Sequence, residues 1–250
     1  MSFSEAELER YARQIVIPGV GVAGQQRLQE ARVAIVGLGG LGAPAALYLA
    51  AAGVGHLTVI ENDLLENSNL QRQVLYETRD VGKPKVEQGV RHLQALNPWV
   101  SYRGVGELLE EGNAISLLAG HQVVISCVDS GAARQVINRA CLELNTPWVD
   151  GGVVRSHGMV MTHLPRQGPC YHCLHPEEDF QEGLTPAQLG VWGAAAGVIG
   201  SLQAMEALKL ILGETANLLV GRMLWFDMQN MHVREVVMEA NPSCPLCGGG

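Results

Sequence analysis

Positive charge is scarce in this sequence. Its 17 lysine and arginine residues are outnumbered by 25 aspartate and glutamate residues, which gives a formal net charge of -8 and a pI of about 5.5. Proteins that bind nucleic acids or anionic membrane surfaces normally present a basic face. The composition therefore argues against both classes, and we expect no nucleic-acid partner and no membrane partner.

The sequence also lacks an uninterrupted apolar run that could cross a bilayer. Its longest apolar stretch, residues 191–205, contains polar residues and is followed at once by charged ones, whereas a membrane helix needs about 20 apolar residues. We predict a buried helix there instead. Its Gly193, Gly197 and Gly200 would let another backbone come close, either within the subunit or across a dimer.

A secretory signal is missing at the start of the sequence. The first residues, MSFSEAELERY, are acidic and amphipathic, where a signal peptide would have a cationic start and an apolar run. We therefore expect a cytoplasmic protein. Ser4 and Glu7 form a capping box, which predicts a helix over residues 5–15.

The order of the predicted elements indicates an α/β fold in a single domain. The 250 residues, 47% of them hydrophobic, suffice for one substantial core. Strand and helix patterns alternate up to residue 150, which predicts a Rossmann-like, mostly parallel sheet with helices on both faces. Strands without intervening helices then predict an antiparallel C-terminal extension of that sheet.

We divide the domain 1–250 into a helical arm (1–30), a nucleotide-binding half (31–150) and the extension (151–250). Strands are expected near 32–36, 56–61, 100–105, 122–127, 146–150, 158–164, 221–227 and 232–239. Further helices are expected near 23–29, 40–52, 83–96, 110–119 and 130–144, with irregular chain at 165–190.

Residues 31–42, ARVAIVGLGGLG, have the pattern of a buried strand that runs into a glycine-rich turn. Gly37, Gly39 and Gly42 have the spacing G-x-G-x-x-G, which lets the backbone and a helix N-terminus approach a phosphate. Glu61 ends the second predicted strand, where a carboxylate can accept hydrogen bonds from ribose hydroxyls. This glycine loop predicts a nucleotide site, and taken alone it favours a dinucleotide.

Polar side chains gather shortly after the second strand. Asp63 is followed by SNLQRQ (residues 68–73), in which Asn69, Arg72 and Gln73 offer hydrogen-bond donors, and Lys85 opens the next predicted helix. So many donors suit a reaction at phosphorus, in which negative charge builds up on phosphate groups. For Arg72 or Lys85 taken singly, a solvated surface position is the alternative.

Asp129 follows the fourth predicted strand, again at a carboxyl end. A carboxylate there can hold a magnesium ion between phosphates. Its alternative role is to cap the following helix, and the two roles are compatible.

Four of the six cysteines form two C-x-x-C pairs, Cys170 with Cys173 and Cys244 with Cys247. Four thiolates paired in this way suit a structural, tetrahedral Zn2+ site with no open position for catalysis. Two disulfides are one alternative, which a reducing compartment disfavours, and a redox C-x-x-C, which normally stands alone at a helix start, is the other. Cys127 and Cys141 are expected to be inert core residues.

In combination and in this order, several motifs give the chain its resemblance to the ThiF/MoeB adenylyltransferases, the bacterial relatives of ubiquitin-activating enzymes. The motifs are RYARQI (10–15), VGLGGLG (36–42), SNLQRQ (68–73), GKPK (82–85), CVD (127–129), GVIGSLQAMEALK (197–209) and the paired C-x-x-C.

The resemblance implies a homodimeric, zinc-containing enzyme that uses ATP with Mg2+. Such an enzyme adenylates the C-terminal Gly-Gly carboxylate of a small ubiquitin-like sulfur-carrier protein (ThiS/MoaD-like), releases pyrophosphate and leaves an acyl-adenylate for sulfur transfer. By matching position, the implied phosphate ligands are Gly39, Gly40, Gly42, Asn69, Arg72 and Lys85, with Glu61 at the ribose and Asp129 at magnesium. Arg13 matches an arginine that reaches into the nucleotide site of the partner subunit.

Some positions depart from the pattern of the family. The stretch Leu184-Thr185-Pro186 lacks the cysteine found there in many relatives, so we expect the reaction to stop at the adenylate. No rhodanese-like extension follows Gly250, which implies a separate sulfur donor. Asp129 is followed by Ser130 where asparagine is usual.

Other functions stay open at this point. A different ubiquitin-like protein or a short peptide is one alternative substrate. An NAD-dependent oxidoreductase would fit the glycine loop and Glu61 but not the donor-rich segment 68–73. The third alternative is a scaffold protein without catalytic activity that is stabilised by zinc.

Overall fold

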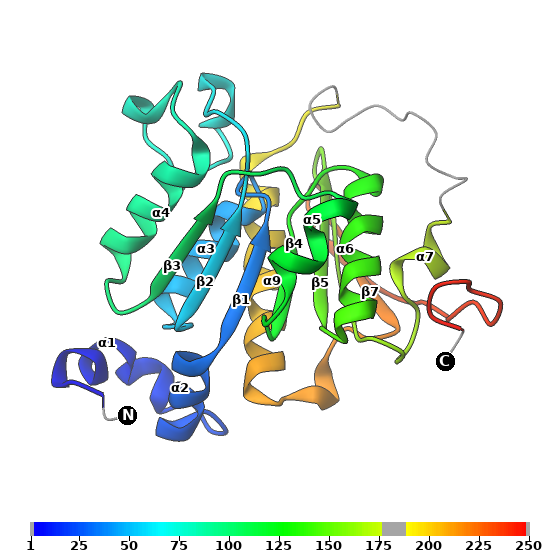
Figure 1. The fold of residues 1–250 in the computed structure, drawn as a ribbon, viewed down its shortest axis with the longest axis horizontal. Coiled ribbons are helices and arrows are strands. Elements are labelled where there is room, and N and C mark those ends of the chain that lie inside the picture. Colours follow the sequence, from blue (N-terminus) through cyan, green and yellow to red (C-terminus); the bar gives the residue numbers. More distant parts are fainter. Residues whose placement is uncertain (1–2, 177–188, 249–250) are drawn as a thin grey trace.

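The structure, a computed structural model, describes residues 3–176 and 189–248 (Figure 1). The predicted loop around Pro186 and the closing glycines 249–250 lie outside these residues. The described chain forms an eight-stranded sheet in the order β3-β2-β1-β4-β5-β6-β7-β8. Its strands are β1 (Arg32–Val36), β2 (His56–Ile60), β3 (Ser101–Val105), β4 (Val123–Ser126), β5 (Trp148–Val154), β6 (His157–His163), β7 (Arg222–Asp227) and β8 (His232–Val237).

The sheet has a parallel half and an antiparallel half. Neighbours from β3 to β5 pair in parallel, and β5-β6, β6-β7 and β7-β8 pair antiparallel. This confirms the predicted fold class. The strand order reverses between β1 and β4, so the carboxyl ends of these two strands mark the crevice where such sheets bind ligands.

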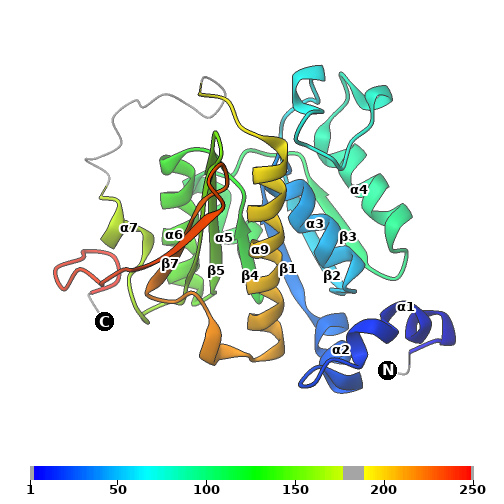
Figure 2. The same cartoon turned by 180° about the vertical axis from the view of Figure 1, so that it is seen from behind.

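Helices cover both faces of the sheet (Figures 1 and 2). One apolar cluster lies between the sheet and α2, α3, α4 and α9, and a second lies between the sheet, α5 and α6. The larger helices are α1 (Glu5–Ile15), α2 (Gly21–Glu30), α3 (Gly42–Ala51), α4 (Lys85–Leu96), α5 (Glu111–Leu118), α6 (Gly131–Leu144) and α9 (Gly193–Leu212). Short helical turns are η1 (Asn67–Asn69), η2 (Thr78–Asp80), α7 (Tyr171–Leu174) and η4 (Thr215–Asn217).

Among the described residues, α9 is the one helix that is long and apolar enough to span a bilayer. In its most apolar 18-residue stretch, 44% is buried inside the protein. It lies in front of the sheet beside α3 in Figure 2, and its Ala196, Ile199 and Ala204 belong to the core. A core helix passes the same length test, so this is weak evidence for a membrane segment. The packing agrees with the predicted buried helix.

The glycines of α9 contact the same subunit at two positions. A Cβ on Gly200 would lie 2.3 Å from the Leu41 carbonyl oxygen, and one on Gly193 would lie 2.4 Å from that of Gln71. A Cβ on Gly197 would meet no atom within 4 Å. Close approach therefore occurs within the subunit at Gly193 and Gly200.

Two predicted boundaries were wrong, and long-range pairing explains one of them. Strand β5 continues past residue 150 to Val154, because Gly151–Val154 pair with β6. The segment 165–190 was predicted to be irregular, yet it contains α7, which starts directly after Cys170. The capping box of α1 is confirmed, since Ser4 Oγ accepts from the Glu7 N–H and Glu7 Oε2 accepts from the Ser4 N–H.

Candidate functional site

A cavity of about 840 Å³ opens at the carboxyl ends of the parallel strands. It brings together most of the residues predicted for nucleotide binding, although they come from separate segments. The predicted residues that line it are Gly37, Gly39, Gly40, Glu61, Asp63, Asn69, Arg72, Gln73, Lys85 and Asp129. Gly42 lies at the start of α3 behind this lining.

The glycine loop turns tightly under the cavity. Gly37 has φ +88°, and a Cβ there would lie 2.8 Å from the Cys127 carbonyl oxygen. A Cβ on Gly42 would lie 2.0 Å from the carbonyl oxygen of Gly37. Gly37 and Gly42 must therefore be glycine because the backbone leaves no room for a Cβ, and Gly39 and Gly40 line the cavity between them.

Glu61 holds the loop in place. One carboxylate oxygen accepts from the Leu38 N–H and the other from the Asp63 N–H, each at 2.9 Å. The Tyr76 hydroxyl donates to the Leu38 carbonyl oxygen at 3.0 Å. Burial raises the pKa of Tyr76, so it stays a neutral donor. Sequence reasoning missed Tyr76, because an isolated tyrosine carries no spacing signal.

The segment 68–73 lies against the glycine loop. A Cβ on Gly40 would meet the Arg72 side chain at 3.4 Å, and one on Gly39 would meet Gln73 Nε2 at 3.5 Å. Gln73 is 3% exposed, and its Oε1 has no hydrogen-bond partner among the described residues. Asn69 is also buried, and its Oδ1 accepts from the Glu66 N–H at the start of η1. These side chains place several donors beside the loop.

Lys85 is a buried cation at the edge of the cavity. It is 5% exposed, so the alternative of a solvated surface position is wrong for this residue. Its Nζ lies 2.8 Å from Asp63 Oδ2, and its backbone N–H donates to the Asp63 carbonyl oxygen. Burying a lysine is costly without an anionic partner, and Asp63 supplies that partner at the edge of the cavity.

Asp129 follows β4 and lies exposed at the cavity. The alternative that it caps α6 is wrong, because the N-cap is Ser130, whose Oγ accepts from the Ala133 N–H at 3.2 Å. The carboxylate of Asp129 is therefore not the cap of this helix.

Arg134 and Asp150 form an ion pair that sequence reasoning missed. Arg134 Nε donates to Asp150 Oδ1 and Nη2 donates to the Gly151 carbonyl oxygen, both at 2.8 Å. Asp150 is fully buried, whereas Arg134 lines the cavity. Burial lowers the pKa of Arg134, but Asp150, Tyr171 and Asp129 together outweigh it and raise the pKa. The pair fixes the first turn of α6 to the middle of β5.

Arg13 is not at this cavity in its own chain. It is exposed on α1, which lies beyond the amino ends of the strands, opposite the glycine loop (Figure 1). Nothing within one subunit brings it to the nucleotide site.

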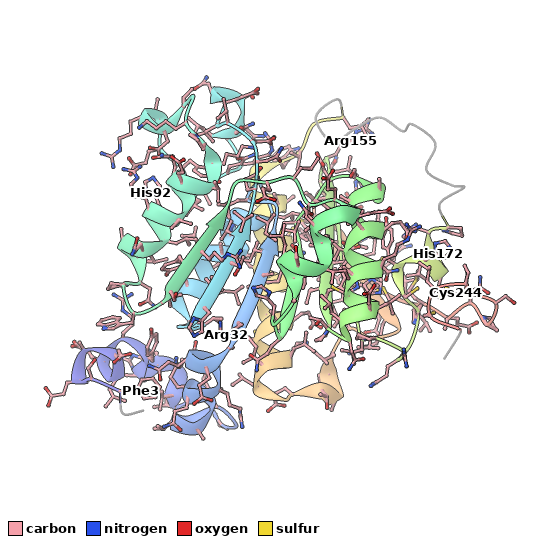
Figure 3. The ribbon with its side chains drawn as sticks, viewed as in Figure 1. Phe3, Arg32, His92, Arg155, His172 and Cys244 are labelled. Carbon is pink, nitrogen blue, oxygen red and sulfur yellow. The ribbon has the colours of Figure 1, made fainter. Side chains whose placement is uncertain are left out.

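The four paired cysteines come together where α7 meets the C-terminal segment, with sulfur–sulfur distances of 3.8 Å from Cys170 to Cys173, 3.7 Å from Cys170 to Cys244 and 3.4 Å from Cys173 to Cys247; Figure 3 labels Cys244. Their sulfur atoms all lie within 4.8 Å of one another. Burial raises the pKa of Cys244, but the Cys247 and Leu246 N–H groups outweigh it and lower the pKa to about 7. Sulfur donors at this separation fit a tetrahedral metal ion. Cys127 and Cys141 are buried, and burial raises the pKa of both thiols.

Comparison with known proteins gives matches along the whole described fold. The ThiF family model matches residues 11–246. A SAMP-activating enzyme E1 of Haloferax volcanii is 42% identical over 252 residues, covering 100% of this chain and 92% of that protein. A sulfur carrier protein adenylyltransferase of Thermus thermophilus is 42% identical over 255 residues, covering 99% of this chain and 93% of that protein. The solved structure of E. coli MccB with MccA-N7isoASN shares the fold, with a TM-score of 0.85 at 23% identity, over 99% of this chain and 76% of that one.

Proposed function

We propose that this chain, which belongs to the ThiF family, is an adenylyltransferase that uses ATP to activate a small ubiquitin-like sulfur carrier. The C-terminal Gly-Gly carboxylate of the carrier attacks the α-phosphate of ATP. One oxygen-phosphorus bond forms as the bond to the β-phosphate breaks, so the products are an acyl-adenylate and pyrophosphate. Residues 1–250 act as one adenylation domain.

The observation that carries this proposal is the position of Arg72, Gln73 and Lys85 around the glycine loop. Arg72 and Gln73 lie directly over Gly40 and Gly39, and Lys85 is buried at the same cavity. Charge builds up on the phosphates as pyrophosphate leaves, and fixed donors stabilise that charge. A dinucleotide oxidoreductase needs no such cluster beside its pyrophosphate.

Each group has a proposed role. Glu61 binds the ribose hydroxyls while its bonds to Leu38 and Asp63 keep the loop rigid. Asn69, Arg72 and Lys85 bind phosphate oxygens, which holds the α-phosphate in line with the incoming carboxylate. Asp129 would hold Mg2+, which when bound neutralises part of the phosphate charge.

We infer that a narrow chain end enters the cavity beside residues 190–192. Gly190 and Val191 line the cavity, the Val191 carbonyl oxygen accepts from Gln71, and Arg155 pairs with Gly190 and Trp192 through backbone bonds of 2.8 and 3.0 Å. A tail that ends in two glycines has no side chains to clash with these residues. The same opening would also admit a short peptide, which remains the second candidate substrate.

We also propose the assembly and the cofactors. The four cysteines hold a structural Zn2+, which anchors the C-terminal segment to α7. The enzyme is a homodimer in which Arg13 of each subunit reaches the nucleotide site of the other. Sulfur comes from a separate donor protein, and the enzyme acts in the cytoplasm.

Product analysis tests the proposal. The protein is incubated with ATP, Mg2+ and a carrier that ends in Gly-Gly, and the carrier is then examined by intact mass spectrometry. We expect a mass increase of one AMP, and none with a carrier that lacks the final glycine. Thermal stabilisation by NADH with none by ATP would instead support the oxidoreductase.

A further inference from the structure

Two amide side chains of α6 hold α7, the short helix that carries the first C-x-x-C pair. Asn138 Oδ1 accepts a hydrogen bond of 3.1 Å from the backbone N–H of Tyr171, the residue directly after Cys170. Gln135 Nε2 donates to the His175 carbonyl oxygen at 2.7 Å, at the other end of α7. The turn between Cys170 and Cys173 is thus fixed to α6 at both ends.

The orientation of the Asn138 amide is unambiguous. A backbone N–H group can only donate, so the atom that faces Tyr171 must be the amide oxygen. The NH2 group of Asn138 therefore points the other way.

That NH2 group has no partner of its own. Asn138 is fully buried, and its Nδ2 has no hydrogen-bond acceptor among the residues that the structure describes. An unpaired buried donor is unfavourable and calls for an explanation. Cys170 lies next to it, because it directly precedes Tyr171 in the chain and its thiol is in contact with the Asn138 side chain.

We propose that Asn138 is a positioning residue of the cysteine cluster, whose Nδ2–H group donates a hydrogen bond to the Cys170 sulfur when that sulfur is a metal-bound thiolate. A thiolate is a better acceptor than a thiol, so metal binding supplies the partner that the amide lacks. Asn138 then holds the ligand through its sulfur and through the backbone that follows it. Partners of metal ligands tune affinity in this way.

This inference rests on the zinc part of the proposed function. It adds that zinc retention depends on a helix of the nucleotide-binding half, since α6 begins directly after Asp129 and Ser130. Arg134, one turn before Asn138 on α6, lines the nucleotide cavity. The same helix therefore contacts both sites.

The test compares zinc release from three versions of the purified full-length protein, measured with a colorimetric chelator. Asn138→Asp keeps an oxygen for the Tyr171 N–H but replaces the donor with a second oxygen. We expect it to release zinc about 10- to 100-fold faster than the wild type. Gln135→Ala is the matched control, because it removes the other α6 amide that holds α7, through the His175 carbonyl oxygen and the His172 ring. We expect its release rate to stay close to that of the wild type.

A measurement on the wild type does not depend on a variant that folds. In protein loaded with 113Cd2+, we expect an NMR correlation between the metal and the side-chain NH2 protons of Asn138, transmitted through the Cys170 sulfur. Zinc release from Asn138→Asp at the wild-type rate, or equal acceleration by Gln135→Ala, would overturn the inference, as would absence of that correlation. A wild-type protein that binds no metal would refute the zinc proposal itself.

Discussion

Lys85 Nζ lies 2.8 Å from Asp63 Oδ2, which joins a lysine that is 5% exposed to a carboxylate at the surface of the cavity. The lysine is thus held at the nucleotide site before ATP arrives. Because Asp63 is largely exposed, the pair is open to water, and phosphate oxygens can take over the contact with Nζ.

Lys85→Met tests this cation. Methionine keeps the length of the side chain and removes the charge, so we expect the fold to survive while adenylation falls about 100- to 1,000-fold, the usual effect of removing a donor to transition-state charge. Initial rates of pyrophosphate release measure the effect. The control is Lys83→Met, which removes an exposed lysine two residues away. Near-normal turnover in Lys85→Met would contradict the proposed role.

The partner role of Arg13 has a stoichiometric consequence. If each site takes Arg72 from one subunit and Arg13 from the other, Arg13→Ala and Arg72→Ala homodimers are both inactive. In a mixed dimer one site regains both arginines, so random exchange should restore about a quarter of wild-type activity. Mixing the two purified variants and measuring activity over time checks this. No recovery after confirmed subunit exchange would exclude the arrangement.

The fold was largely predictable from the sequence, but parts of the site were not. The parallel strands and their helices follow from local patterns, such as the apolar run of β1 and the capping box of α1. Asp150 and Arg134 are 16 positions apart, and their contact depends on how α6 packs on β5. Asn138 likewise gained its role from the position of α7. Such contacts have no periodic signal in the chain.

Asp150→Asn should destabilise the protein strongly. It leaves Arg134 with an uncompensated buried charge, which typically costs about 3–5 kcal/mol. Denaturant unfolding at neutral pH measures the free energy of unfolding. Glu235→Gln is the comparison, because it breaks the exposed pair with Arg222, worth about 0–1 kcal/mol. Equal losses in the two variants would show that burial of the first pair has no energetic effect.

Stability should fall as the pH drops below about 6.5, the ordinary histidine pKa. Burial lowers the pKa of His163, which stacks on Trp148 with ring centroids 4.4 Å apart. Between the lowered pKa and about 6.5 the unfolded chain binds a proton that the folded chain does not, so stability rises with pH across this window. His163→Gln should flatten the slope of unfolding free energy against pH. The control His232→Gln, at an exposed histidine, should leave this slope unchanged. An unchanged slope in His163→Gln would be inconsistent with this account.

The exchange of labelled pyrophosphate into ATP tests the central claim most directly, since only reversible formation of an acyl-adenylate moves the label. The account predicts exchange that requires a carrier ending in Gly-Gly, disappears when its last glycine is deleted, and is lost in Arg72→Ala while the metal content stays unchanged. Exchange that persists in Arg72→Ala, or no exchange with any Gly-Gly carrier or peptide, would contradict it.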